Sequence, residues 1–230
     1  MGHEFTGMVE SVGSAVRTVK PGDKIVSPFT ISCGICFYCQ NGLSSRCTKS
    51  LCFGSEALDG AQAEYVRVPL ADSSVMKAPS GIQDEALVLM GDIFPTGYFA
   101  VSNGFKGMTA EQISQSTVVV IGCGPVGLCA IVNATEYKPK HLFAIDRVES
   151  RLKLAGKLGA EPLNLDKGPD SLEQRIHEVT DGRGADIVIE VVGLSPALEL
   201  AFSLIRPFGV ISSVGVHNGE VCYIINEIGH

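Results

Sequence analysis

Four cysteines within one short stretch follow the order C-x2-C-x2-C-x7-C, and they are Cys33, Cys36, Cys39 and Cys47. Four thiolates at such intervals can close a tetrahedron around Zn2+ and leave no open position on the metal. The sequence therefore predicts a structural zinc site, which holds a loop and takes no part in a reaction. A pair of disulfides is one alternative, and it needs an oxidising compartment. An iron–sulfur cluster is the other, but its last cysteine is commonly followed by a proline, and Cys47 is not.

One glycine-rich segment has the form G-x-G-x-x-G and consists of Gly122, Cys123, Gly124, Pro125, Val126 and Gly127. Such patterns are common in turns and carry little weight alone. Here the segment follows a β-branched run, Thr117–Ile121, and opens a helical pattern, Gly127–Tyr137. In that setting the glycines permit a tight turn, the approach of a pyrophosphate and close packing of helix on strand. The segment therefore predicts a dinucleotide-binding loop.

Asp146 stands 24 residues after Gly122, at the end of the next expected strand, His141–Ile145. A carboxylate at this point accepts hydrogen bonds from the 2′- and 3′-hydroxyls of an adenosine ribose and repels a 2′-phosphate. The sequence therefore favours NAD over NADP as the cofactor. Arg147, the next residue, weakens that preference because it is basic.

Two further residues raise the question of a second, catalytic metal. His3 precedes an alternating segment, where a single histidine is usually structural. Asp92 lies in the apolar stretch Ala86–Phe94, and a buried carboxylate is costly unless a cation or hydrogen-bond donors compensate its charge. The alternative for Asp92 is an N-cap of a short helix around Thr96–Val101.

The composition limits the class of protein. The chain has 230 residues, 45% of them hydrophobic, with a net charge of -7 and a pI near 5.2. The acidic balance argues against nucleic acid or an anionic membrane as a partner, because both require a basic face. No apolar run is long enough to cross a bilayer, and the first residues are not a secretion signal. We expect a cytoplasmic protein whose other cysteines are small buried hydrophobes: Cys52, Cys123, Cys129 and Cys222.

The elements that must position these residues change in character near residue 110. Before it, we expect a β-rich unit with strands at Met8–Val12, Lys24–Val26 and Ala63–Val68. After it, strands and helices alternate, which predicts a parallel sheet covered on both faces. The expected helices are 127–137, 149–158, 171–180 and 195–205, and the expected strands are 117–121, 141–145, 162–165, 186–192 and 210–214. We place the boundary between a first domain, 1–95, and a dinucleotide-binding domain, 96–230.

Taken in order, these motifs resemble those of the zinc-containing medium-chain dehydrogenases, alcohol dehydrogenase-like and of the fungal type. The resemblance rests on the cysteine cluster, the fingerprint at 122–127 and three further segments: Gly2-His3-Glu4, Gly22-Asp23 and Gly91 to Tyr98. It implies a Rossmann-type doubly wound parallel sheet, preceded by a partial β-rich GroES-like domain that carries the zinc lobe 33–47.

The resemblance also implies roles for single residues. His3 and Asp92 become ligands of a catalytic zinc, although cysteine is the commoner residue at the second position. Glu4 is then a carboxylate that can approach the metal, and Thr96 lies near the nicotinamide. The expected cofactor contacts, beyond the glycine segment and Asp146, are Arg147, Arg151, Val192, Gly193, Val214, Gly215 and Val216. His217 follows the last expected strand at its carboxyl edge and is a further candidate for a cofactor contact. The alternative is that it is an ordinary loop residue.

The family continues on both sides of this sequence, so we expect the chain to be incomplete at both ends. In the family, residues ahead of Gly-His-Glu include the first cysteine of the catalytic zinc, and residues after the segment matching His217–Gly219 include the final strand of the sheet. Val221–Asn226 does not read like that continuation. We expect the intact family member to form homo-oligomers.

Three functions remain open. The first is a zinc- and NAD-dependent oxidoreductase that transfers hydride between NAD and a small alcohol or an aldehyde hydrate. The second is a non-catalytic NAD- and zinc-binding fragment or paralogue of such an enzyme. The third is a reductase with a zinc lobe and no catalytic metal, for which loss of Asp92 would be harmless.

Overall fold

The structure, a computed structural model, describes residues 1–219. Its contacts divide the chain into two compact units, Met1–Pro95 and a second unit that starts at Thr96. No helix within residues 1–219 is long and apolar enough to cross a membrane.

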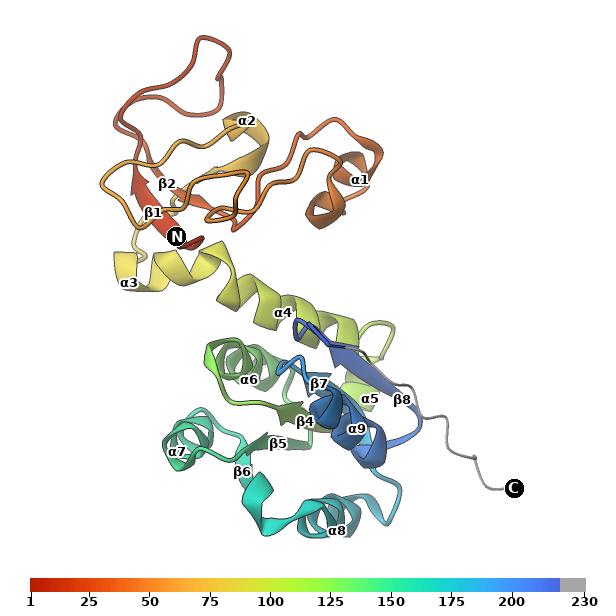
Figure 1. Ribbon diagram of the computed structural model, residues 1–230. Helices are drawn as coiled ribbons and strands as arrows, with labels where there is room; N and C mark the ends of the chain where they lie inside the picture. The colour runs from red at the N-terminus through yellow and green to blue at the C-terminus, as the bar shows by residue number, and fades with distance from the viewer. Residues whose placement is uncertain (220–230) are drawn as a thin grey trace. The chain divides into compact units, whose positions relative to one another are not determined.

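The first unit contains a three-stranded antiparallel sheet in the order β1-β2-β3 (Figure 1). Its strands are β1 (Phe5–Met8), β2 (Lys24–Ser27) and β3 (Met76–Lys77). Its short helices are α1 (Phe37–Gln40), η1 (Ser44–Arg46), α2 (Ala71–Ser74), α3 (Asp84–Leu87) and η2 (Val88–Gly91). A small core forms beside the sheet from Phe5, Val19, Ile25, Ile31, Phe53 and Leu58.

Two of the three strand predictions for this unit are wrong. The chain leaves the sheet after Met8, where Val9 still bonds to the carbonyl of Asp23, so the expected strand Met8–Val12 is not formed. The segment Ala63–Val68 is also not a strand. A β-rich sequence becomes a strand only beside a partner, and within residues 1–219 this segment has no neighbouring strand.

The second unit contains a five-stranded parallel sheet in the order β6-β5-β4-β7-β8. Its strands are β4 (Thr117–Ile121), β5 (His141–Asp146), β6 (Glu161–Asn164), β7 (Ala185–Glu190) and β8 (Ile205–Ser213). The helices are α4 (Ile93–Gly104), which starts at the end of the first unit, α5 (Ala110–Gln115), α6 (Pro125–Tyr137), α7 (Glu149–Lys157), η3 (Leu165–Lys167), α8 (Pro169–Thr180) and α9 (Ser195–Leu204).

Helices cover both faces of this sheet (Figure 1). Every residue of β4 is buried, and successive side chains enter opposite layers. Val118 and Val120 pack in a core with residues of α4, α6 and α7, whereas Val119 and Ile121 pack in a second core with residues of α8 and α9. The predicted doubly wound parallel sheet is therefore confirmed.

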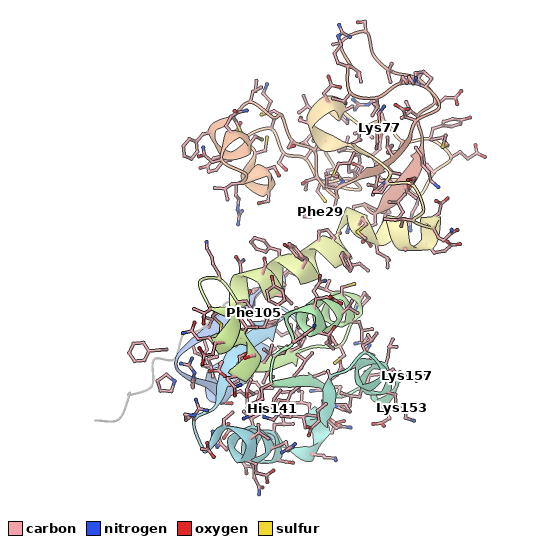
Figure 2. All side chains as sticks on the ribbon, turned by 180° about the vertical axis from the view of Figure 1, so that it is seen from behind. Phe29, Lys77, Phe105, His141, Lys153 and Lys157 are labelled. Atoms are coloured by element: carbon pink, nitrogen blue, oxygen red, sulfur yellow. The ribbon has the colours of Figure 1, made fainter. Side chains whose placement is uncertain are left out.

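The expected elements of this unit differ from the structure mainly at their ends. The largest difference is at β8, which begins at Ile205 and not at residue 210, because α9 ends at Leu204 and the chain pairs with Ala185 at once. The charged face of α7 is solvated, and Lys153 and Lys157 extend from it away from the sheet (Figure 2).

The isolated cysteines differ in burial. Cys123 is fully buried, and burial raises the pKa of its thiol to about 12, so it acts as a small hydrophobe. Cys52 and Cys129 are only partly buried, and Cys222 lies outside the described residues.

Candidate functional site

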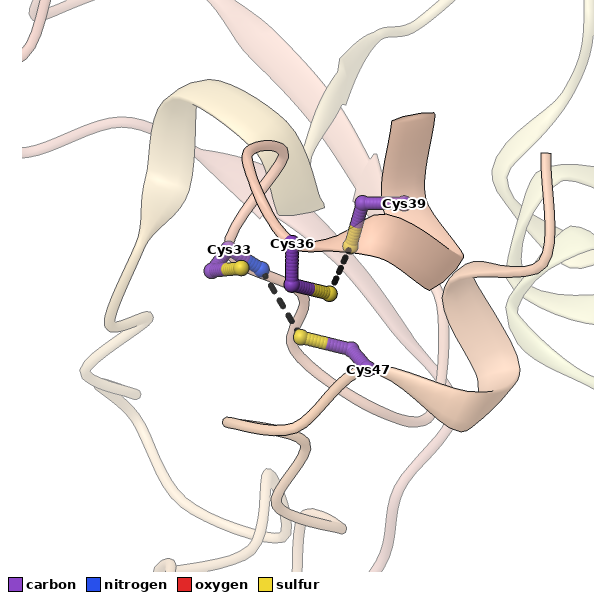
Figure 3. A group of neighbouring side chains, drawn as sticks. All are labelled: Cys33, Cys36, Cys39 and Cys47. Carbon is purple, nitrogen blue, oxygen red and sulfur yellow. Dashed lines mark hydrogen bonds between the residues drawn. The ribbon is translucent and has the colours of Figure 1, made fainter. Parts of the chain in front are cut away.

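The four clustered cysteines converge on one point. Cys33, Cys36, Cys39 and Cys47 come from the loop that holds α1 and η1, and their sulfur atoms all lie within 4.8 Å of one another (Figure 3). Backbone N–H groups already point at the sulfur of Cys47, from Cys33 at 3.2 Å and from Lys49 at 3.3 Å. Such N–H donors stabilise a thiolate and are typical surroundings of a metal-bound cysteine.

The electrostatics of this cluster fit a cation. Backbone N–H donors, chiefly that of Cys39, lower the pKa of Cys36 to about 6. Burial and the neighbouring thiol of Cys36 raise the pKa of Cys39 to about 11. Four thiols this close cannot all ionise, because like charges repel each other, unless a metal ion supplies positive charge. The donor set of four sulfurs is the set that structural zinc prefers.

His3 and Asp92 meet although 89 positions separate them in the chain. The Nε2 atom of His3 lies 3.0 Å from Oδ2 of Asp92, and both side chains are partly exposed. The ring of His3 also lies 5.9 Å from the ring of Phe29. Imidazole nitrogen and carboxylate oxygen are both zinc ligands, so this pair supplies two converging donors.

Glu4 contacts the start of α4, and Thr96 is a residue of this helix. Oε1 of Glu4 accepts a hydrogen bond of 3.1 Å from the backbone N–H of Ile93, so this carboxylate holds the beginning of the helix. A carboxylate at a helix N-terminus also interacts favourably with the positive end of the helix dipole. Thr96 lies within the first turns of α4. The expected roles of Glu4 and Thr96 near a metal and a nicotinamide stay predictions.

The glycine loop lies between β4 and α6, as a dinucleotide-binding loop must. Gly122 has a φ of +97°, a conformation that a residue with a side chain rarely adopts. A Cβ atom on Gly127 would lie 1.8 Å from the carbonyl oxygen of Gly122, so only glycine permits this closeness of helix and strand. A Cβ on Gly124 would meet nothing within 4 Å, so the space in front of this residue is open. Pro125 is the first residue of the helix, and Val126 follows it.

Asp146 ends β5 beside this loop and is 9% exposed. Its Oδ2 accepts a hydrogen bond of 2.8 Å from the N–H of Cys123, which ties it to the glycine loop. Its Oδ1 accepts two more of 2.8 Å each from the N–H groups of Arg147 and Val148. Nη1 of Arg151 lies 3.8 Å from Oδ2. The carboxylate is thus held in place by backbone donors, with two basic residues beside it.

A groove of about 1050 Å³ opens at the carboxyl ends of these strands. It is lined by seven of the expected cofactor contacts, namely Gly122, Gly124, Pro125, Asp146, Arg147, Arg151 and Val192. Ligands of open α/β sheets bind at this edge, so the groove is the natural place for a dinucleotide.

The other expected contacts lie beside the groove and not among its lining residues. A Cβ on Gly215 would lie 2.1 Å from the nitrogen of Gly193, and a Cβ on Gly193 would lie 2.5 Å from the nitrogen of Val216. The turn after β7 and the segment after β8, which includes Val214, therefore pack tightly on each other. Their contact with a cofactor stays a prediction.

One cluster at this edge, formed by Glu190, Ser213 and His217, is not predicted by the sequence. Glu190, the last residue of β7, is fully buried, and its Oε2 accepts a hydrogen bond of 2.6 Å from Oγ of Ser213. Nε2 of His217 lies 3.3 Å from the same oxygen. Only His217 had been singled out, and a glutamate at the end of an apolar run carries no signal of burial.

Two family models match the chain. Residues 1–80 match the alcohol dehydrogenase GroES-like domain, and residues 125–229 match the zinc-binding dehydrogenase domain. Both halves of the predicted fold, the GroES-like part and the Rossmann-type part, are confirmed by these matches together with the parallel sheet.

Curated relatives agree with the two models. Over 99% of the chain, a "Zinc-type alcohol dehydrogenase B" of Aspergillus flavus is 64% identical, and the match covers 53% of that relative. Over 96% of the chain, a "Medium chain reductase/dehydrogenase ucsI" of an Acremonium species is 62% identical, with 76% of the relative covered. The chain thus spans about half the length of the first relative and three quarters of the second.

A solved structure shows the same fold. The alcohol dehydrogenase TADH from Thermus sp. ATN1 is 38% identical to this chain and superposes with a TM-score of 0.87. The match covers 95% of this chain and 62% of that one.

Proposed function

The chain belongs to the zinc-containing medium-chain dehydrogenases, and we propose that it forms the core of a zinc-dependent oxidoreductase that transfers hydride between NAD and an alcohol or aldehyde hydrate. The observation that carries this proposal is the groove in which the glycine loop and the backbone-held carboxylate of Asp146 stand side by side. His3 and Asp92 add a pair of donors for a metal in the first unit.

When bound, NAD accepts a hydride on its nicotinamide ring, and zinc supplies the Lewis acidity that lowers the pKa of an alcohol. The residues of this chain bind and orient these groups. The N-terminus of α6 and the open backbone at Gly124 bind the pyrophosphate. Asp146 accepts hydrogen bonds from the ribose, and His3 and Asp92 hold the metal. The four cysteines hold a second zinc that keeps their loop folded.

The preference for NAD over NADP is part of this proposal. Asp146 carries a full negative charge where a 2′-phosphate would sit, and its three backbone donors leave it little freedom to move away. Arg147 and Arg151 line the same groove and offset part of the repulsion. We therefore expect a preference for NAD that is moderate in size.

The proposal extends to the organisation of the protein. Unit 1–95 is the partial GroES-like catalytic domain and unit 96–230 is the dinucleotide-binding domain. The substrate is a small molecule, and the intact protein is a cytoplasmic homo-oligomer. Four cysteines that bind zinc must stay reduced, and a reducing compartment keeps them so.

One observation favours the alternative, a non-catalytic fragment that binds zinc and NAD. Among residues 1–219, only the cysteine cluster brings three or more metal-ligand atoms within 4.8 Å of one another. His3 and Asp92 provide two donors, whereas catalytic zinc usually has three protein ligands.

Zinc content and turnover of the purified chain decide between the two functions. We expect two zinc ions per chain and NADH formation with short alcohols or formaldehyde. Asp92→Asn should lose turnover and one zinc, whereas Cys47→Ser should lose the other zinc. A single zinc in the unaltered chain, no turnover and intact NADH binding would establish the non-catalytic alternative.

A further inference from the structure

Glu190 connects two segments that meet at the edge of the dinucleotide groove. Its Oε1 accepts hydrogen bonds of 2.7 Å from the backbone N–H groups of both Val192 and Gly193, in the turn after β7. Its Oε2 accepts the hydroxyl of Ser213 at the end of β8. Its own carbonyl accepts the N–H of Val214 at 2.9 Å. One residue therefore holds both the turn and the strand end.

The carboxylate of Glu190 receives more hydrogen bonds than would be needed to join two strands. A buried carboxylate is strongly unfavourable unless donors surround it, and Glu190 is 0% exposed. Neighbouring parallel strands are already joined by the backbone, as the pairing of Glu190 with Ser213 shows. Two of the four groups that contact its carboxylate belong to the turn, so the carboxylate holds the turn as well as the strand end.

The fourth partner of the carboxylate is His217. The Ser213 hydroxyl donates a hydrogen bond to Oε2 of Glu190. Nε2 of His217 lies 3.2 Å from that hydroxyl oxygen and 3.3 Å from the carboxylate, so this nitrogen faces both oxygen atoms. Nδ1 is left buried with no hydrogen-bond partner among residues 1–219. The orientation of His217 thus places Nε2 beside the carboxylate and leaves Nδ1 without a hydrogen bond among these residues.

The turn that Glu190 holds presses on the glycine loop. A Cβ on Gly122 would lie 2.7 Å from Cγ2 of Val192 and 3.3 Å from Cγ2 of Val191. A Cβ on Gly127 would lie 3.2 Å from Cγ2 of Val191. The two valines also line the groove. They support the loop from the side while they form part of the binding surface.

We propose that Glu190, fixed by Ser213 and His217, is a positioning residue that holds the Val191–Gly193 turn against the glycine loop and thereby shapes the loop for a dinucleotide pyrophosphate. None of the three residues lines the groove, so each acts through the turn. The proposal rests on the proposed function for the identity of the ligand, but the positioning of the loop can be tested without any ligand.

The first test is hydrogen exchange of the ligand-free protein, followed in two segments. One is the glycine loop, Ile121–Leu128, and the other is the reference segment Leu172–Thr180 of α8. We expect loop amides to exchange at least about tenfold faster in Glu190→Ala and about threefold faster in Ser213→Ala, with the reference within about twofold of the unaltered protein. Ser212→Ala, on the same strand but the opposite face, is the matched control and should change neither segment.

The second test is the affinity for NADH. Ser213→Ala should weaken binding about threefold, and Glu190→Gln should stay within about threefold, because its amide oxygen still accepts both N–H groups of the turn. Adding Ser213→Ala to Glu190→Ala should cause no further loss, because Ser213 acts through Glu190. If Glu190→Ala does not fold, Ser213→Ala and Glu190→Gln still carry both tests.

The outcomes separate the two proposals. Equal exchange in Ser213→Ala and Ser212→Ala, or equal acceleration of loop and reference segment, would overturn the positioning role. Failure of the unaltered chain to bind NADH would overturn the proposed function instead, while the exchange data would still decide whether Glu190 orders the loop.

Discussion

In the proposed function, the carboxylate of Asp146 sets the choice between the two dinucleotides. In Asp146→Ser the repulsion of a 2′-phosphate is removed, and Arg147 and Arg151 become free to pair with it. We expect the ratio of NADPH to NADH affinity to rise at least about tenfold, because a phosphate–guanidinium pair is a strong charge-assisted contact. Fluorescence titration with both cofactors measures the ratio.

The control for this substitution is Glu149→Gln. Glu149 begins α7 but does not line the groove, so its loss should leave the ratio unchanged. A parallel loss of both affinities in Asp146→Ser would mean that the carboxylate mainly supports the glycine loop, through its bond to Cys123.

The last two glycines of the loop, Gly124 and Gly127, should respond differently to alanine. Gly127→Ala places a Cβ 1.8 Å from the oxygen of Gly122, and overpacking of this kind costs about 1–3 kcal/mol or more. Gly124→Ala meets nothing within 4 Å, so stability should change by less than about 1 kcal/mol while the added methyl group obstructs a pyrophosphate.

Thermal unfolding and NADH titration, measured on both variants, test this contrast. We expect Gly127→Ala to lose stability and NADH binding, and Gly124→Ala to lose binding alone. Unchanged NADH affinity in Gly124→Ala would show that the phosphates do not approach the loop at this residue.

Much of the candidate site was accessible from the order of residues in the chain. The cysteines are close in sequence, so their convergence follows from spacing. Asp146 follows the glycine loop by one strand of a regular βαβ unit, which fixes its place beside the loop. The contact between His3 and Asp92 spans 89 positions and came only from the resemblance to a family. Glu190 was missed because burial of a charged side chain depends on donors supplied by another strand.

At the scale of elements, the two units differ in how well their sequence predicts them. β4 is buried along its whole length, so its run of β-branched residues is diagnostic. In the first unit a strand forms only where a partner lies beside it, and pairing is not encoded locally. The start of β8 was also not predictable, because β8 begins directly at the end of α9 without the loop that the sequence pattern predicts.

The carboxylate of Asp72 joins α2 to a distant loop. It accepts hydrogen bonds from the N–H groups of Thr18 and Arg17 and from the hydroxyl of Thr18, and these bonds lower the pKa of Asp72 below its ordinary value of 3.8. Its stabilising effect is therefore complete above pH 3.8 and is lost as the pH falls through the lower pKa of the folded state.

We expect Asp72→Asn to be less stable than the unaltered chain at pH 7, with a difference that shrinks below pH 3.8. Denaturant unfolding at a series of pH values measures this difference. Asp84→Asn is the control, because Asp84 is an exposed carboxylate that pairs with the side chain of Lys24. A stability difference that stayed constant down to low pH would contradict the assigned hydrogen bonds.

At the scale of the whole molecule, the metal and dinucleotide sites belong to units with separate cores. The core of the first unit is built from residues between Phe5 and Leu58, and the two cores of the second are built from residues between Ala100 and Leu204. The cysteine cluster lies in the first unit, and all residues that line the groove lie in the second. Loss of zinc from the loop should therefore leave the groove folded.

We expect a strong chelator to remove the zinc held by the cysteines while the affinity for NADH changes by less than about twofold, because metal binding stabilises only the part that folds around it. Metal analysis and NADH titration of the same sample provide the measurement. Cys47→Ser should reproduce the result without chelator, whereas Cys129→Ser, on α6, should retain the metal. Loss of NADH binding together with the metal would mean that the two units fold as one, and the separate cores would then be insufficient to make each unit stable by itself.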